Sequence, residues 1–394
     1  MKDEMKNTGR RIIGMDMHPD VFSAAALRGG NAAQARAEWI HDRQAVGKLE
    51  QWARKHLDSA DIVVLEASGN SFEVAVRLHE CGITAVVLES AQAAKIRDNY
   101  CNDDRHSAVK LARVYMSGLA REVWKPDAQT RERREVLYAY RNTVKDATRG
   151  RNRIRGLLNE YCVRLPKGTR LTEQSGQTKA LSMRAWTPMQ ETLIRARFEQ
   201  LRENEKRRRA LEEVMTHELL AHNEWKKLWR LMGVGVCTAF ALMAHIGQIN
   251  RFATAKKLCG YFGLAPGRVQ SGNDAKGRGL GMGGQGRPDM RALLMQGAQN
   301  AMMNKASPLH KWGWRLCLRK AKNVAVAAVA RKLCVSIWHL LKGHHSELNE
   351  TPAQLKAKLY CIATLLGKEQ LRKMQFENRE AFVTHQLQTI FIPT

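Results

Sequence analysis

The chain has 394 residues, with 65 Lys and Arg against 38 Asp and Glu, and a formal net charge of +27. Hydrophobic residues make up 44% and charged residues 26%, which is typical of globular proteins and excludes an intrinsically disordered chain. At about 100–200 residues per domain, the length predicts two or three domains. Residues 1–125 have a charge balance of only +1, so the excess lies in residues 126–394. A body so basic is expected to bind a polyanion, most simply the phosphate backbone of DNA or RNA.

An anionic membrane is the alternative partner for such charge, and the sequence does not favour it. We find no secretory signal and no uninterrupted apolar run near 18 residues, and the nearest run, 323–330, is followed by Arg331 and Lys332. The eight cysteines are far apart and contain no CxxC pair, which predicts reduced and mostly buried thiols in a cytoplasmic protein. They are Cys81, Cys101, Cys162, Cys237, Cys259, Cys317, Cys334 and Cys361.

Apolar strands alternate with helical segments in the first 125 residues. Two of the predicted strands bring an acid to their end, namely Asp16 and Glu66. This alternation predicts an α/β sheet covered by helices. The predicted elements are strands over 11–17, 21–27, 61–66 and 83–88, an amphipathic segment over 72–79 and a helix over 106–120.

A helical arm is predicted after Pro126, where the charge balance changes. From Leu137 onward, apolar residues recur at alternating spacings of three and four, which predicts a helix that packs against a partner helix. A second long charged helix is predicted from about Met189 to Trp229, with residues 166–188 as a linker. The arm is either a spacer with solvated charges or a nucleic-acid contact.

The third region combines glycine motifs with dense positive charge. Gly233-Val234-Gly235 is the pattern of a helix-hairpin-helix, whose turn directs backbone N–H groups at a phosphate, although an ordinary helix–helix turn explains it equally well. Residues 251–332 hold 16 Lys and Arg and only two acids. A glycine-rich run within them could approach a phosphate closely, or could be a flexible surface loop. The predicted backbone contacts are Arg268, Lys276, Arg278, Arg287 and Arg291.

Carboxylates from three segments could meet above one sheet. Asp16 and Glu66 end strands, and Asp103-Asp104 open a helix. Clustered carboxylates repel one another unless divalent cations lie between them, and Mg²⁺ is the usual choice beside phosphates. For any one of these acids, a capping or turn role is the simpler explanation.

Ser271 is the second chemical candidate. It lies among Arg268, Lys276 and Arg278, where a phosphodiester would bind. A serine hydroxyl becomes a nucleophile only when a base or metal activates it and the attacked centre is stabilised. A surface or capping serine is the alternative.

Motifs in both parts of the chain carry a resemblance to a known family. The N-terminal motifs are Ile13-Gly14-Met15-Asp16-Met17-His18, Leu65-Glu66-Ala67-Ser68-Gly69, Asp104-Arg105-His106-Ser107-Ala108 and Val123-Trp124-Lys125-Pro126-Asp127. The C-terminal motifs are Gly233-Val234-Gly235, Gly263-Leu264-Ala265-Pro266, Gln270-Ser271-Gly272 and Ala330-Arg331-Lys332-Leu333. In this collinear order the chain resembles the DEDD transposases of the insertion-sequence "one-ten" family, to which the pilin-gene invertases also belong.

The resemblance implies an architecture. A RuvC-like, ribonuclease-H-type domain would occupy residues 11–125 after a polar tail over 1–10. A coiled-coil arm would follow over 126–229, and then a mainly helical, serine-bearing transposase domain with a helix-hairpin-helix over 230–349. Residues 350–394 lie outside the resemblance and are expected to form a helical extension.

The resemblance also implies a mechanism and partners. A bridge RNA would pair with target and donor double-stranded DNA, and subunits would assemble as dimers to tetramers in the bacterial cytoplasm, associated with the nucleoid. Asp16, Glu66 and Asp104 would hold Mg²⁺, and Ser271 would attack a DNA phosphate and become covalently joined to the strand. The metal cluster of one subunit would work with the serine of another. No GxxxxGK[ST] motif for ATP is present.

Ser107 departs from the family pattern, which has a fourth acid at this position. Residues three apart share a helix face, so the missing carboxylate would have pointed at the same metal as Asp104. Asp103 or His106 could compensate. A catalytically weakened nucleic-acid-binding relative and a metal-only RuvC-type junction nuclease therefore stay open as alternatives to the recombinase.

Overall fold

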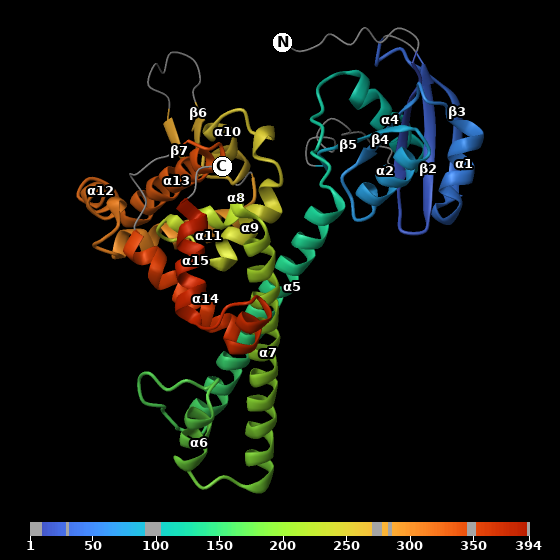
Figure 1. Ribbon diagram of the computed structural model, residues 1–394. Helices are drawn as coiled ribbons and strands as arrows, with labels where there is room; N and C mark the ends of the chain where they lie inside the picture. Colours follow the sequence, from blue (N-terminus) through green and yellow to red (C-terminus); the bar gives the residue numbers. More distant parts are fainter. Residues whose placement is uncertain are drawn as a thin grey trace. The chain divides into compact units, whose positions relative to one another are not determined.

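A computed structural model describes residues 10–28, 31–90, 104–269, 278–282, 286–344 and 352–391 of the protein (Figure 1). The chain divides into two compact units, Met1–Pro126 and Asp127–Thr394. The division falls at the residue where the charge balance of the sequence changes.

The first unit is built on a five-stranded mixed sheet with the order β3-β2-β1-β4-β5. β1 pairs antiparallel with β2, which pairs antiparallel with β3, whereas β1, β4 and β5 are parallel neighbours. The predicted α/β sheet is therefore confirmed, with β3 as an additional edge strand. The strands are β1 (Ile12–Met17), β2 (Val21–Arg28), β3 (Arg36–Ala45), β4 (Ile62–Glu66) and β5 (Thr84–Leu88).

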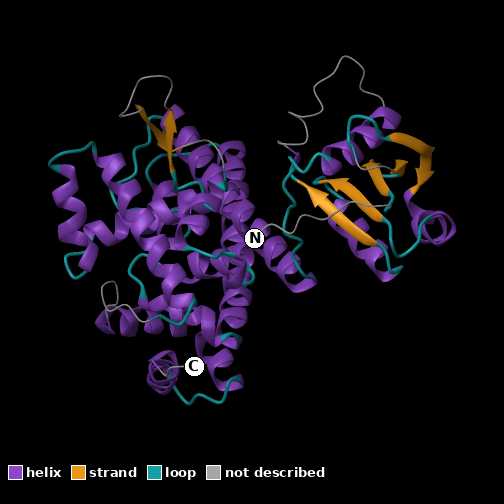
Figure 2. Ribbon diagram, turned by 90° about the horizontal axis from the view of Figure 1, so that it is seen from above, coloured by secondary structure: helices purple, strands orange, loops and turns teal. Residues whose placement is uncertain are grey.

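Helices cover both faces of this sheet (Figure 2). Alternate strand residues point to opposite faces. Ile13 and Met15 of β1 pack in one cluster with α1 (Leu49–His56) and α2 (Ser71–Glu80). Ile12 packs in the cluster on the other face, which is covered by α4 (Asp104–Met116).

The second unit begins with the predicted helical arm, made of α5 (Ala128–Glu160) and α7 (Pro188–Ala221), which pack side by side (Figure 1). Asp127 caps α5 by accepting a hydrogen bond from the Thr130 N–H at 2.6 Å. The heptad stripe lies inward as predicted. Its buried members are Leu137, Tyr140, Ala147, Ile154 and Leu158 on α5 and Ile194, Phe198 and Leu201 on α7.

Two predictions for the arm were wrong in detail. Residues 166–188 are not a plain linker, because they contain α6 (Gln174–Ser182) and bury Leu171 and Ala180 in the cluster that closes the end of the arm. The second long helix stops at Ala221, and two short helices follow it, α8 (Asn223–Lys226) and η2 (Lys227–Arg230).

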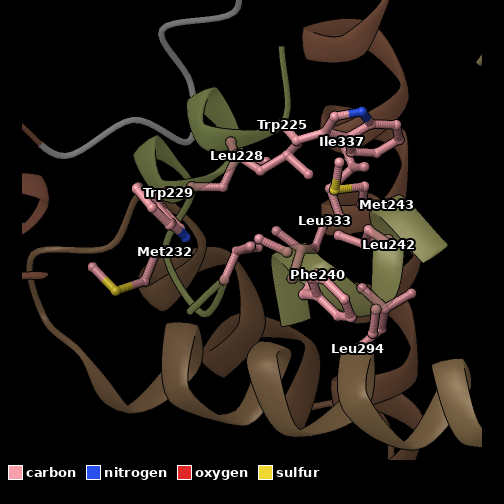
Figure 3. Packing of buried hydrophobic residues seen from close by; sticks show 14 of the residues in the cluster. Trp225, Leu228, Trp229, Met232, Phe240, Leu242, Met243, Leu294, Leu333 and Ile337 are labelled. Carbon is pink, nitrogen blue, oxygen red and sulfur yellow. The ribbon is translucent and has the colours of Figure 1, made fainter. Parts of the chain in front are cut away.

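A helical core forms the rest of the second unit. Trp225, Leu228 and Trp229 from α8 and η2 lie in the same buried cluster as Phe240 of α9 and Leu333 of α13 (Figure 3). A two-stranded hairpin of β6 and β7 projects from this core (Figure 1). The elements are α9 (Val236–Ile246), η3 (Ile249–Arg251), α10 (Ala255–Tyr261), β6 (Pro266–Val269), β7 (Arg278–Met282), α11 (Pro288–Met303), α12 (Pro308–Cys317) and α13 (Lys322–Leu341).

α13 is the one helix in the described part of the chain that is long and apolar enough to cross a membrane. Arg331 and Lys332 interrupt its apolar sequence without ending the helix. Val329, Leu333 and Ile337 are fully buried in the protein. Packing in the helical core therefore accounts for the apolar composition of α13.

The predicted C-terminal helical extension consists of α14 (Pro352–Lys373) and α15 (Arg379–Phe391), and it belongs to the same core. The Lys358 ammonium donates to the carbonyl oxygens of Trp229, Leu231 and Val234 at 2.8, 2.6 and 2.9 Å. The extension thereby holds the chain between η2 and α9.

The cysteines that the structure describes are free thiols, as predicted. The expectation that most are buried was wrong, because Cys259 and Cys334 are buried whereas Cys162 and Cys361 are exposed.

Candidate functional site

Two acids stand side by side at one edge of the sheet. β1 and β4 are parallel, with Met15 opposite Leu65, so the next residues, Asp16 and Glu66, come alongside each other. Residues at paired positions of parallel strands point to the same face of the sheet. Both acids are half-buried. The structure thus brings together two of the predicted metal ligands.

The backbone of α4 lies directly on the strand that carries Asp16. A Cβ atom on Gly14 would meet the Ala108 carbonyl oxygen at 1.8 Å and the Ala112 nitrogen at 2.8 Å. Gly14 and Asp16 are two residues apart and share one face. α4 therefore covers the face to which Asp16 and Glu66 point, and glycine is needed at position 14 for this close approach.

Two side chains of α4 fix its direction over the sheet. Arg105 Nε donates to Asp42 Oδ2 at 2.7 Å, and Arg113 Nη2 donates to the Ala35 carbonyl oxygen at 3.1 Å. Asp42 lies near the end of β3, whereas Ala35 precedes that strand. Because β3 runs parallel to β1 in this order, α4 runs antiparallel to both strands. Its first residue, Asp104, is thereby directed toward the edge that carries the two acids.

A series of hydrogen bonds holds the first turn of α4 in place. Ser23 lies opposite Asp16 across β1 and β2 and is fully buried. Its hydroxyl donates to Asp42 Oδ1 at 2.7 Å. This bond, followed by the bond from Arg105, lowers the pKa of Asp42. The sequence motifs do not single out Ser23 or Asp42. The one sequence feature that points to this series of hydrogen bonds is the position of Arg105 directly after Asp104.

The remaining predicted positions of the acidic set lie at the start of α4. Asp103 and the side chain of Asp104 lie outside the described residues, and Ser107 is half-buried in the first turns of α4. Among the side chains that are described, no three His, Cys, Asp or Glu residues gather as a metal site. The backbone places Asp104 at the same end of the sheet as Asp16 and Glu66, and the metal-ligand set stays a prediction.

In the sequence, the serine candidate falls between the two strands of the β6–β7 hairpin. Pro266 lies opposite Met282, and Val269 opposite Arg278. Arg268 and Arg278 are therefore on the two strands of the hairpin, although their side chains are outside the described residues. Ser271 and Lys276 also lie outside the described residues.

The last two predicted cations lie where the chain leaves the hairpin. Arg287 Nη2 donates to Asp289 Oδ2 at 3.4 Å, and Arg291 Nη1 donates to the Gly263 carbonyl oxygen at 3.4 Å. Both side chains are half-buried. The structure brings Arg287 and Arg291 to the base of the hairpin.

Close packing explains why the first residue of the Gly-x-Gly turn is a glycine. Gly233 has a φ of +83°, and a Cβ atom there would lie 2.2 Å from the Gly297 carbonyl oxygen. The turn is thus pressed against α11, while Lys358 binds the Val234 carbonyl oxygen. Gly235 is the N-cap residue of α9.

Two transposase family models match this chain, one in its N-terminal part and one in its C-terminal part. A DEDD-type transposase family model matches residues 13–163, and a model of the IS116/IS110/IS902 transposase family matches residues 226–312. The chain is 26% identical over 338 residues to the transposase for insertion sequence element IS1111A of Coxiella burnetii, covering 84% of this chain and 89% of that protein. It is 25% identical over 292 residues to a probable family 20 transposase of Pseudomonas aeruginosa, covering 71% of this chain and 83% of that protein.

Proposed function

This chain belongs to the IS110 family of insertion-sequence transposases and is a DNA transposase, and from this premise we propose that it is an RNA-guided recombinase with a phosphoserine intermediate. A bridge RNA would select target and donor DNA by base pairing, and dimers to tetramers would assemble around it. These partners and the location at the bacterial nucleoid come from the family resemblance.

The observation that carries the proposal is the arrangement at the edge of the first sheet. Asp16 and Glu66 end neighbouring parallel strands, and α4 starts at Asp104 over the same face. The strand order, with three antiparallel strands joined to two parallel ones, supports a RuvC-like, ribonuclease-H-type domain. The helix-hairpin-helix stays a prediction for the turn between η2 and α9.

The residues fit a hard divalent cation. Two half-buried carboxylates at adjacent strand ends provide the oxygen ligands that Mg²⁺ prefers. When bound there, Mg²⁺ would offset the repulsion between the carboxylates and polarise a phosphate oxygen. Asp104 would complete the set, and Ser107 is the position at which this set differs from the family pattern.

Ser271 supplies the nucleophile in this proposal. Its Oγ forms a bond to phosphorus, the P–O bond to the deoxyribose breaks, and the released deoxyribose oxygen takes up a proton while the hydroxyl loses one. Attack by a deoxyribose hydroxyl on the phosphoserine reverses these changes and rejoins DNA. Arg268, Lys276, Arg278, Arg287 and Arg291 would bind the strand backbone.

The test is an assay for protein-linked DNA with the full-length protein, its co-purified RNA and Mg²⁺. The Ser271→Ala variant is expected to form no adduct, with Ser182→Ala on α6 as the control. Asp16→Asn and Glu66→Gln should each reduce the adduct by about 100-fold or more, as loss of one catalytic electrostatic group commonly does. Asp20→Asn, an exposed acid in the β1–β2 turn, is the control for these two variants.

The two alternatives give different results in this assay. A metal-only nuclease would cut DNA equally well after Ser271→Ala and leave no protein attached. A catalytically weakened relative, for which Ser107 is the specific observation, would bind nucleic acid without cutting it. Restoring a carboxylate with Ser107→Asp should then recover cleavage.

A further inference from the structure

Two cysteines of the second unit lie close together where α10 packs against α13. Cys259 of α10 and Cys334 of α13 are both fully buried in the same apolar cluster. The Cys259 thiol donates to the Arg331 carbonyl oxygen over 3.8 Å. Side chains of a helix lean toward its N-terminus, so the Cys334 side chain extends over the turn that holds Arg331. The Cys259 sulfur therefore lies at the same level of α13 as the Cys334 thiol.

A hydrogen bond between the two thiols makes them chemically different. The bond from the Cys334 thiol, together with the nearby charge of Arg331, lowers the pKa of Cys259 against the opposing effect of burial. The same bond, together with burial, raises the pKa of Cys334. The thiolate, not the thiol, is the form that reacts with an oxidant. Cys259 is thus the more nucleophilic member of the pair, and Cys334 keeps its proton.

Cys237 of α9 provides the contrast within the same unit. Its side chain is partly buried, and burial raises the pKa of this thiol to about 11. A thiol with so high a pKa is almost entirely protonated near pH 7 and reacts slowly. Burial alone therefore makes a thiol of this core unreactive, and the lowered pKa of Cys259 comes from its two neighbours, Cys334 and Arg331.

A cavity of about 650 Å³ lies beside the turn of α13 that carries this pair, and its lining includes Leu264, Arg331 and Val335. Arg331 and Val335 stand on either side of Cys334 in the sequence, and the Leu264 N–H donates to the Cys259 carbonyl oxygen at 2.9 Å. The cavity therefore lies next to the ends of both helices where the thiols meet. Hydrogen peroxide is small enough to enter it, and local opening of the helix contact gives access to the sulfur atoms.

We propose that Cys259 and Cys334 are a redox modification site that forms a reversible disulfide when the protein meets hydrogen peroxide. The Cys259 thiolate attacks one peroxide oxygen, the O–O bond breaks, and the released hydroxide takes up a proton and leaves as water. The Cys334 sulfur then attacks the sulfenic acid sulfur, the S–O bond breaks, and the hydroxyl leaves as water with the Cys334 proton. Two thiols are oxidised and one peroxide is reduced. Thiols in hydrogen-bond contact need only small side-chain movements to reach the S–S distance of about 2 Å.

The disulfide would tie α10 to α13. Because α10 leads through Leu264 into β6, oxidation would hold the start of the β6–β7 hairpin against the helical core. A cross-link between residues that are distant in the chain also restricts the unfolded state and stabilises the folded one. The site does not depend on the proposed function, because neither cysteine belongs to the proposed catalytic set.

The test treats the reduced, full-length protein with hydrogen peroxide, blocks the remaining thiols with N-ethylmaleimide in denaturant, and digests the protein with trypsin without reductant. Trypsin releases the two cysteines in separate peptides, residues 258–268 and 333–342, which contain no other cysteine. Mass spectrometry should find these peptides joined in protein that runs as a monomer on a non-reducing gel, and dithiothreitol should separate them. In the same sample, Cys237 should carry N-ethylmaleimide.

Two results would overturn the proposal. Peptides 258–268 and 333–342 could both carry N-ethylmaleimide after a treatment that oxidises the exposed Cys162 and Cys361. The link could also form only when the protein is oxidised in denaturant, which would show that the folded pair is not ready to bond. Both results come from the wild-type protein, so the decision does not require any variant to fold.

Variants test the different roles of the two thiols. Cys334→Ala should stop the oxidation at a sulfenic acid on Cys259, which dimedone labels, whereas Cys259→Ala should leave Cys334 reduced. Cys361→Ala, on the exposed side of α14, is the matched control and should form the link as the wild type does. Oxidation should raise the Tm of the wild type by about 5 °C, reversibly with dithiothreitol, and should not raise that of Cys334→Ala. A lower Tm in the linked protein would contradict a pair that is poised to bond in the native fold.

Discussion

Ion pairs and main-chain carbonyl contacts occur in both units, but two buried contacts differ in kind. In the α/β unit, Arg11 binds the Asp61 carboxylate through Nε at 2.9 Å and Nη2 at 2.6 Å. In the helical unit, Lys358 and Arg251 donate to main-chain carbonyls instead. A carboxylate cancels a positive charge, whereas a carbonyl oxygen satisfies the donor and leaves the charge in place. The contacts of Lys358 therefore satisfy its donors without cancelling its charge.

The largest expected effect tests the carbonyl-bound lysine. Lys358→Met leaves three carbonyl oxygens without their donor, and the free energy of unfolding should fall by about 3–5 kcal/mol. Burial lowers the pKa of Lys358 to about 8, so the ammonium is present near neutral pH, where the measurement is made. Denaturant unfolding of the full chain gives the value.

Lys356→Met is the matched control, because Lys356 is exposed on the same helix. It should change stability by less than about 0.5 kcal/mol. If the two variants lose the same amount, the extension does not hold the turn between η2 and α9, and the contrast between the units loses its main support.

The second prediction tests the carboxylate-paired arginine of the α/β unit. Only 2% of the Asp61 side chain is exposed, so Arg11→Met leaves a buried carboxylate without its partner. The free energy of unfolding should fall by about 3 kcal/mol. Arg28→Met removes an exposed pair with Glu38 and should cost less than about 1 kcal/mol. Recovery of stability in the double variant Arg11→Met with Asp61→Asn would show that the unpaired charge is the cause.

A third prediction tests the close packing that aligns the acids. Gly14→Ala forces the α4 backbone away from β1, because the added Cβ atom would lie 1.8 Å from the Ala108 carbonyl oxygen. Stability should fall by about 2 kcal/mol. Mg²⁺-dependent cleavage should fall by more than the loss of folded protein accounts for, because the start of α4 moves away from Asp16. Gly47→Ala, which has open space around it, is the control, and equal cleavage by the two variants would contradict the proposed role of α4.

The sequence predicted the elements of both units that local patterns encode. Apolar runs that end in Asp16 and Glu66 predicted two strands of one sheet, and the heptad stripe from Leu137 predicted the arm. The edge strand β3 was missed because its residues are mostly polar and only partly buried. The contacts of Lys358 were missed because it is more than 120 residues from its carbonyl partners in the chain, and only the fold brings them together.

The smallest expected effect tests a carboxylate pair that lies at the surface. Arg77 Nη2 donates to Glu50 Oε2 at 2.9 Å, and the Glu50 side chain is 38% exposed. Glu50→Gln should therefore cost less than about 0.5 kcal/mol at pH 7, where solvent screens the pair. The hydrogen bond from Arg77 lowers the pKa of Glu50 from 4.5 to about 2.

Because the pKa of Glu50 is lower in the folded chain, its contribution is present above pH 4.5 and declines as the pH falls toward 2. Denaturant unfolding at pH 7, 4 and 3 should show the difference between wild type and Glu50→Gln shrinking with acid, while Glu80→Gln, at the exposed end of α2, shows no such trend. A difference that grows in acid would contradict this assignment. A small, acid-sensitive effect would mean that this surface pair adds little to the stability of the α/β unit, in contrast to the buried carbonyl contacts of Lys358 in the helical unit.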